Sequence, residues 1–366
     1  MLGIIYNMTY VCPHACSICC VDSIKPTEKN GILEIQYNAL QQTISVPRNG
    51  QNMYTQASHI LAQKGFELSY LDKMNILKQL DVPDLELQIS GGDALLNPEN
   101  LKFLVAASQK IGRNNLSLVT TSKGIKIEDI PYISQYISQY SCAFDNPYKT
   151  RSLEYRSKNY VSDNLKIAQE FMKNNVSVQT ECTLTKDNLK PKLLRDMFFA
   201  LHDAGIKNHL LMRIVPFVGR NQIQTNIPTD VEYKAGINFL KSLEEKYKYP
   251  KINLICSLKN LYPEQCAQNP CQMSRHVMGL TPSGHLLLSP YGFGACNTPI
   301  APEFDLGSLL QYPLSVLIEK KTRLETLKRM DENYGDCKIQ SFLFSKKKEF
   351  MERLLDKADP LYHQRG

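Results

Sequence analysis

The stretch VCPHACSICCV, residues 11–21, holds four of the eleven cysteines in this 366-residue chain. Within it, Cys12, Cys16 and Cys19 follow the spacing Cys-x3-Cys-x2-Cys directly after the apolar segment GIIYNMT (3–9). In a reducing compartment, clustered thiols hold metal or carry out redox chemistry more often than they form disulfides. The stretch therefore predicts a metal or iron–sulfur site on one tight loop that follows a strand.

Three thiolates are one ligand short of the usual set for a cubane iron–sulfur cluster. An incomplete set leaves one iron open to bind a substrate or cofactor, much as a catalytic zinc site keeps an open position. A structural zinc site is the alternative, with Cys20 or His14 as the fourth ligand.

The composition of the chain indicates its compartment and the kinds of partner it binds. No secretory signal opens the chain and no long apolar run appears, so we expect a cytoplasmic protein without a membrane span. The 43 basic and 36 acidic residues give a net charge of +7, and basic runs such as residues 346–348 stand beside acidic ones. This mixture is typical of a solvated surface and argues against a nucleic-acid partner.

Short apolar runs alternate with amphipathic segments between residues 66 and 255, which predicts a parallel α/β fold. The candidate strands are GIIYNMT (3–9), LELQIS (85–90), LSLVTTS (116–122), YSCAF (140–144), VSVQTEC (176–182) and HLLMRIV (209–215). Residues 24–64 interrupt this pattern as a long connection, a surface insertion or a functional lid. Beyond residue 255 the alternation stops and five cysteines follow, which indicates a second module.

These features together resemble the radical SAM enzymes, whose hallmark is CX3CX2C after the first barrel strand. The further similarities over residues 3–220 are LQISGGDALLNPENL (87–101), LVTTSKG (118–124), FDNPYKTRSLEYR (144–156) and MRIVPFVGR (212–220). The resemblance implies an α/β fold with a partial (β/α)6 TIM-type barrel over residues 1–250. It also implies that the motifs gather at the carboxyl ends of the strands, where such folds place their active sites.

The resemblance assigns roles to individual residues. The three cysteines would hold a [4Fe–4S] cluster that binds S-adenosylmethionine. The residues implied to contact that cofactor are Gly91, Gly92 and Asp93 at the amino group, Ser122 at the ribose or carboxylate, Arg156 at the carboxylate, and Val215 near the adenine. Asp93 stands where glutamate is commoner, and Ile18 where an aromatic residue is usual. Cys20 has no place in the motif, and we expect it in packing.

The C-terminal region, residues 251–366, resembles the SPASM or twitch extension that carries an auxiliary iron–sulfur cluster. The matching stretches are CSLKNLYPEQCAQNPC (256–271), TPSGHLLLSPY (281–291) and DLGSLLQYPLSVLI (305–318). One cysteine that the family has near residues 288–290 is missing. The implied ligands are Cys266, Cys271, Cys296 and Cys337, with Cys256 in reserve. Unligated thiols or a structural zinc are the alternative.

The resemblance implies that the protein reductively cleaves S-adenosylmethionine and abstracts a hydrogen atom from a substrate, with a reductase such as flavodoxin or ferredoxin as electron donor. A peptide or protein side chain is the expected substrate. A small molecule of natural-product biosynthesis and a non-catalytic metal-binding protein are the alternatives. Cys182, or Cys142, would donate a hydrogen atom if it faced the barrel interior. The other interpretation is a small apolar core residue.

Overall fold

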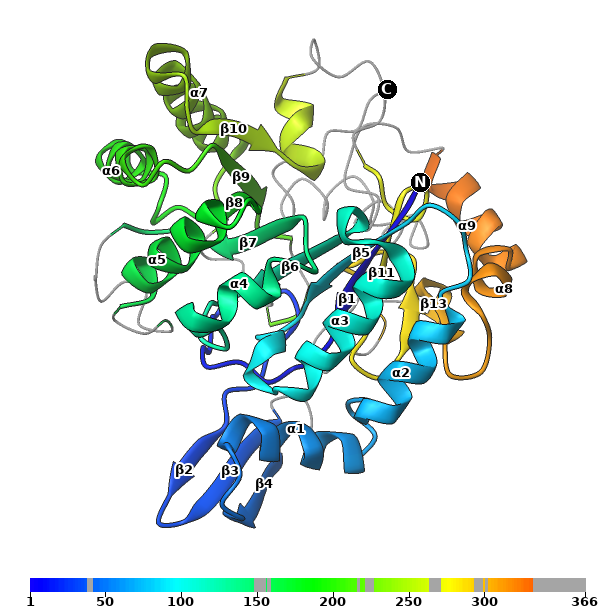
Figure 1. The fold of residues 1–366 in the computed structure, drawn as a ribbon. Coiled ribbons are helices and arrows are strands. Elements are labelled where there is room, and N and C mark those ends of the chain that lie inside the picture. The colour runs from blue at the N-terminus through cyan, green and yellow to red at the C-terminus, as the bar shows by residue number, and fades with distance from the viewer. Residues whose placement is uncertain are drawn as a thin grey trace.

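A computed structural model describes residues 1–37, 42–147, 156, 159–215, 218–220, 227–262, 271–292, 299 and 302–331 of the chain. Its centre is a sheet of ten strands, seen edge-on among the helices in Figure 1. The strands, in spatial order, are β10 (Lys251–Leu254), β9 (Asn208–Arg213), β8 (Ser177–Leu184), β7 (Gln139–Ala143), β6 (Leu116–Thr120), β5 (Leu85–Ser90), β1 (Leu2–Asn7), β11 (Val277–Leu280), β12 (His285–Leu287) and β13 (Asp305–Ser308).

The pairing within this sheet is parallel from β10 through β11 and antiparallel from β11 to β13. All six strands expected from the sequence are present, and the predicted parallel α/β arrangement is confirmed. Four strands from beyond residue 250 join the same sheet, two of them directly beside earlier strands: β10 pairs with β9, and β11 pairs with β1. The proposed division at residue 250 therefore separates segments that share one sheet.

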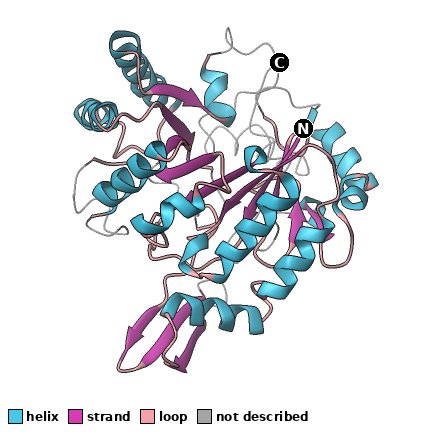
Figure 2. Cartoon of the chain, viewed as in Figure 1, coloured by secondary structure: helices cyan, strands magenta, loops and turns pink. Residues whose placement is uncertain are grey.

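Helices form an outer layer over one face of the parallel strands (Figure 2). The helices of the described residues are α1 (Met53–Gln63), α2 (Tyr70–Gln79), α3 (Glu99–Ile111), α4 (Ile130–Ile133), α5 (Tyr160–Lys173), α6 (Pro191–Asp203), α7 (Asp230–Tyr247), α8 (Leu314–Ile318) and α9 (Lys321–Asp331). None of them has the length and apolar character needed to cross a membrane.

Aromatic pairs join this helical layer to the sheet. The ring of Tyr6 on β1 meets Phe103 of α3 edge-on at 5.7 Å between centroids, and Tyr140 on β7 stacks on Phe171 of α5 at 4.3 Å. All four rings are fully buried, and large apolar side chains of this kind dominate core energetics. The side of the sheet that carries Tyr6 and Tyr140 is therefore the helix-facing side.

The long connection at residues 24–64 folds into a small unit that the sequence pattern did not reveal. It contains an antiparallel sheet of β2 (Thr27–Lys29), β3 (Ile32–Tyr37) and β4 (Gln42–Pro47), followed by α1. Leu33 and Ile35 of β3 are fully buried with Leu61 of α1. The unit projects from the rest of the molecule at the bottom of Figure 1.

Candidate active site

The cysteine loop, residues 8–26, leaves the carboxyl end of β1. Its two arms are tied together, because Cys12 N–H donates to the carbonyl oxygen of Ile24 at 2.8 Å and Ile24 N–H donates to that of Tyr10 at 2.7 Å. A tight turn follows within the loop, where Cys19 N–H donates to the carbonyl oxygen of Cys16 at 3.2 Å. The backbone thus presents the three predicted thiols from one closed loop over the strand ends.

The three thiols are close enough to affect one another. Burial raises the pKa of Cys12, and the neighbouring Cys16 and Cys19 raise it further. Burial likewise raises the pKa of Cys16 to about 11, which the guanidinium of Arg156 opposes. The backbone N–H of Ser23 donates to Cys19 Sγ at 3.3 Å, a contact that stabilises a thiolate. Such hydrogen bonds to sulfur also tune the potential of iron–sulfur clusters.

Three thiols on one loop match the ligand set of a cubane iron–sulfur cluster with one open iron, and the alternative zinc site needs a fourth donor. Within the part of the chain that the structure describes, no three His, Cys, Asp or Glu side chains converge on a point that could hold a single metal ion. A closed zinc site requires four donors around one ion, whereas each thiol of a cubane cluster binds a different iron. His14, the candidate zinc ligand, lies against Tyr160 with 6.4 Å between ring centroids.

Arg220, which follows β9 in the chain, contacts the cysteine loop through its side chain and its backbone. Its Nε donates to Asp22 Oδ1 at 3.0 Å, and its Nη1 donates to the carbonyl oxygen of Cys16 at 3.1 Å. Nη2 donates to the carbonyl oxygen of Ser23, and the backbone N–H donates to that of Cys19 at 2.9 Å. Arg220, in the segment after β9, therefore fixes the turn that carries two of the predicted cluster ligands.

Gly219 permits this contact. Its φ is +57°, in the left-handed region that favours glycine, and a Cβ there would lie 2.4 Å from the carbonyl oxygen of Cys19. A side chain at this position would push the chain after β9 away from the cysteine loop.

The Gly91-Gly92-Asp93 segment follows β5 and packs directly against the cysteine loop. Gly92 N–H donates to the carbonyl oxygen of Thr9 at 2.7 Å, and Asp93 N–H to that of Val11 at 2.9 Å. A Cβ on Gly92 would lie 2.2 Å from the Val11 oxygen, and one on Gly91 2.6 Å from the Thr9 oxygen. In the structure, the close approach that these glycines allow is an approach to the cysteine loop.

Asp93 is fully buried, and only one of its two carboxylate oxygens has hydrogen-bond partners among the described residues. Its Oδ2 accepts hydrogen bonds from Thr121 Oγ1 at 2.5 Å and from Gly124 N–H at 3.2 Å. Its Oδ1 is buried and has no hydrogen-bond partner among the described residues. Burial raises the pKa of this carboxyl group, so a cationic donor at Oδ1 would be favourable. This orphaned acceptor fits the amino group of S-adenosylmethionine.

The other predicted cofactor contacts lie at neighbouring strand ends. Ser122, after β6, has a φ of +67° and its hydroxyl contacts that of Tyr140. Arg156 forms an ion pair with Asp145 at 2.8 Å, and Val215 follows β9. The roles of all three toward the cofactor stay predictions.

The structure places Cys142 and Cys182 on the helix-facing side of the sheet. Cys142 lies two residues beyond Tyr140 on β7 and therefore shares its helix-facing side, and Cys142 pairs in register with Thr180 on β8. Cys182 lies two residues beyond Thr180, is fully buried, and accepts a contact from Asn188 Nδ2 at 3.6 Å. Neither thiol faces the interior of the curved sheet, because each lies on the side that packs against helices.

The insertion reaches the site through α1. Tyr54, near the start of α1, is half-buried, and the pKa of its hydroxyl is raised by burial and then by the nearby Cys12 and Asp93. Asn52 caps α1, with its Oδ1 accepting from Tyr54 N–H at 2.9 Å. The insertion thus contributes a side chain to the surroundings of the cluster ligands.

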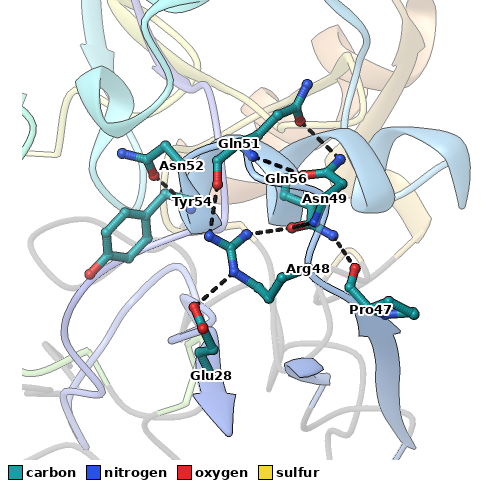
Figure 3. A network of polar contacts seen from close by, with 8 residues as sticks. All are labelled: Glu28, Pro47, Arg48, Asn49, Gln51, Asn52, Tyr54 and Gln56. Atoms are coloured by element: carbon teal, nitrogen blue, oxygen red, sulfur yellow. Dashed lines mark hydrogen bonds and ion pairs between the residues drawn. The ribbon is translucent and has the colours of Figure 1, made fainter. Parts of the chain in front are cut away.

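Arg48 fixes the base of this insertion (Figure 3). It forms an ion pair with Glu28 of β2 at 2.8 Å and donates from Nη2 to the carbonyl oxygen of Gln51 at 2.7 Å. Arg48 also donates to Gln56 of α1, whose amide donates in turn to the carbonyl oxygen of Pro47 at 2.7 Å. These contacts join both edge strands to α1 and so hold the helix that carries Tyr54.

The second cysteine set is only partly described. Cys256 begins a 3-10 helix (Cys256–Leu261) with a φ of +54°, and Cys271 packs against the main core. Cys266, Cys296 and Cys337 lie outside the described residues. The auxiliary cluster stays a prediction.

Neither a protein-family model nor a curated protein matches the sequence. Solved structures do match. SuiB from Streptococcus suis bound to S-adenosylmethionine aligns over 100% of this chain and 76% of its own, with a TM-score of 0.65 and 12% identity. SuiB bound to the precursor peptide SuiA aligns over 88% of this chain at a TM-score of 0.63 and 12% identity, and the chain spans 65% of that SuiB chain.

A third similar structure is that of anSMEcpe with bound AdoMet, with a TM-score of 0.59 and 12% identity over 98% of this chain and 100% of anSMEcpe. These likenesses confirm the expected fold, a partial TIM-type barrel.

Proposed function

We propose that this protein is a radical SAM enzyme whose cluster is held by Cys12, Cys16 and Cys19. When bound, the cluster and S-adenosylmethionine supply a 5′-deoxyadenosyl radical that takes a hydrogen atom from substrate, with flavodoxin or ferredoxin as a suitable electron donor. The observation that carries the proposal is the closed cysteine loop, which presents three thiols beside the orphaned Asp93 Oδ1.

The residues of this chain would divide the work of holding the cofactor. Asp93, supported by Thr121 and Gly124, offers an acceptor to the amino group. Arg156 would meet the carboxylate, since a guanidinium suits bidentate recognition. Ser122 and Val215 would line the nucleoside, and the auxiliary thiols would bind a second cluster.

We infer that the substrate is a peptide or protein side chain. Support comes from two of the similar structures, which are complexes with peptides: SuiB with its precursor peptide SuiA, and anSMEcpe with a peptide named Kp18Cys. The cytoplasm, where thiols stay reduced, is the compartment that suits such clusters.

The test is anaerobic reconstitution of the wild type and of the Cys12/Cys16/Cys19→Ala variant. With two cubane clusters, we expect about eight irons per chain, falling to about four in the variant. We also expect S-adenosylmethionine to alter the electron paramagnetic resonance signal of the reduced wild type only. Cys20→Ala is the matched control and should behave as the wild type. Bound zinc, or equal iron in all three proteins, would contradict the proposal.

A further inference from the structure

The strands of the barrel have a second side, opposite the helices, which we call the inner face. Because residues in register on parallel strands share a side, the inner face of β7, β8 and β9 follows from the helix-facing position of Tyr140. By register and alternation it includes Ser141, Gln179, Glu181, Thr183, Leu210 and Met212. This face is more polar than the helix-facing side and ends in the region of the cysteine loop.

Glu181 is the acidic member of this set. It pairs in register with Ala143 on one side and with Leu210 on the other. It is partly buried, and burial raises the pKa of its carboxyl group although Ser141 and Gln179 beside it oppose the rise. No basic side chain forms an ion pair with Glu181 within the described part of the chain. Burying a carboxylate without a counter-ion is costly, so the site favours a proton or an incoming cation.

Tyr291, from the C-terminal region, contacts the inner face at β9. Tyr291, after β12, donates from its hydroxyl to Met212 Sδ at 3.9 Å, so its side chain reaches from the β12 side of the sheet to β9. The Tyr291 hydroxyl is buried, and its raised pKa reflects burial first and then nearby acidic groups that include Cys256, Cys20 and Glu181. The Tyr291 hydroxyl therefore lies near both Glu181 and Cys20 of the cysteine loop.

We propose that Glu181 is a substrate-binding residue and that it takes a cationic group of the substrate, an ammonium or a guanidinium. The assignment rests on the proposed function, in which a radical formed at the cysteine loop takes a hydrogen atom from a bound substrate. A lysine or arginine side chain, or a free amine, would supply the counter-ion that the described residues do not place beside Glu181. The apolar neighbours Leu210 and Met212 suit the aliphatic stem of such a side chain.

The test is calorimetric titration of the reconstituted holoprotein with Nα-acetyl-lysine amide and with its Nε-acetyl derivative, which has the same backbone but no charge. We expect the charged probe to bind wild type and to lose about tenfold or more in affinity in Glu181→Gln. The uncharged probe should bind weakly and equally to both proteins. Glu86→Gln is the control. Glu86 is exposed at the amino end of β5, and its substitution should leave binding of the charged probe unchanged.

A second variant covers the case in which Glu181→Gln does not fold. Leu210→Lys would place an ammonium beside Glu181, and we expect it to fold and to abolish binding of the charged probe. Equal binding of both probes, unchanged affinity in either variant, or no binding to wild type would overturn the assignment. Because the titration needs no reductant, these outcomes are distinct from a failure to cleave S-adenosylmethionine, which would overturn the proposed function instead.

Discussion

The guanidinium of Arg220 donates to the carbonyl oxygen of Cys16 at 3.1 Å, although 204 residues separate the two along the chain. Together with its contacts to Asp22, Ser23 and Cys19, this places Arg220, in the segment after β9, against the cysteine loop. Arg220 touches no thiol, so it acts by positioning the turn that presents two of them.

We expect Arg220→Met to lower iron incorporation several-fold and to destabilise the folded apoprotein by about 2 kcal/mol or more, because buried carbonyl oxygens lose charged donors. Arg220→Lys should recover part of the iron, since one ammonium cannot reproduce the planar fork. Iron assays and chemical unfolding measure both effects. Arg195→Met, on the exposed side of α6, is the control, and equal iron content in all four proteins would refute the positioning role.

Gly92→Ala should disrupt the contact between β5 and the cysteine loop. The added Cβ would lie 2.2 Å from the Val11 carbonyl oxygen, which is backbone and cannot move aside cheaply. We expect a loss of about 3 kcal/mol or more in the free energy of unfolding. In Gly205→Ala the Cβ meets open space and only the positive φ opposes it, so about 1 kcal/mol is expected. Equal costs at both positions would contradict the packing described here.

Asp93→Asn should weaken binding of S-adenosylmethionine by about tenfold while iron content stays at the wild-type level. The reason is that the substitution keeps the shape of the side chain but removes the charge from the orphaned Oδ1. Equilibrium binding to the oxidised holoprotein measures this. Asp163→Asn removes a carboxylate from an exposed pair with Lys123 and should have no effect. A loss of iron in Asp93→Asn would instead assign the residue to the loop.

His285 and Asp305 join β12 to β13 by a contact of 2.9 Å, and it should make stability depend on pH. The hydrogen bond to Asp305 raises the pKa of His285, and the pKa of Asp305 is lowered by its contacts to His285 and Gly307. The histidine's contribution is complete below its unfolded pKa of about 6.5 and is lost as pH rises through its higher folded value.

The unfolding free energy of wild type should therefore fall between about pH 6 and pH 8 relative to that of His285→Asn. The difference should stay below about 1 kcal/mol, because the pair is partly exposed and screened by solvent. Denaturant titrations at several pH values provide the measurement. A difference that grows with rising pH would show that the sign, and hence the ion pair, is wrong.

Local spacing was sufficient to predict much of this site. Cys12, Cys16 and Cys19 lie on one loop, and the glycine pair lies beside it, because both features depend on short segments at strand ends. The contribution of Arg220 could not be predicted, since its partners lie about 200 residues away and no pattern links them. The only sequence signal for this segment was the resemblance of MRIVPFVGR (212–220) to a family motif, and that resemblance implied a role at the cofactor instead.

The orientation of Cys142 and Cys182 shows a second limit. Alternation along a strand says which residues share a side, but not which side meets the helices. That depends on the contact of Tyr140 with Phe171, formed between β7 and α5. The strands of the insertion were not predicted from the sequence either. β2 is three exposed residues, and the alternation in β3 and β4 is short and polar on one side.

The production of 5′-deoxyadenosine from S-adenosylmethionine by the reduced, reconstituted protein tests the central claim most directly. The account predicts its formation by the wild type and by Cys20→Ala, and its loss when Cys12, Cys16 and Cys19 are replaced by alanine. A wild-type protein that holds a cluster yet forms no 5′-deoxyadenosine, or a triple variant that forms as much as wild type, would contradict the account.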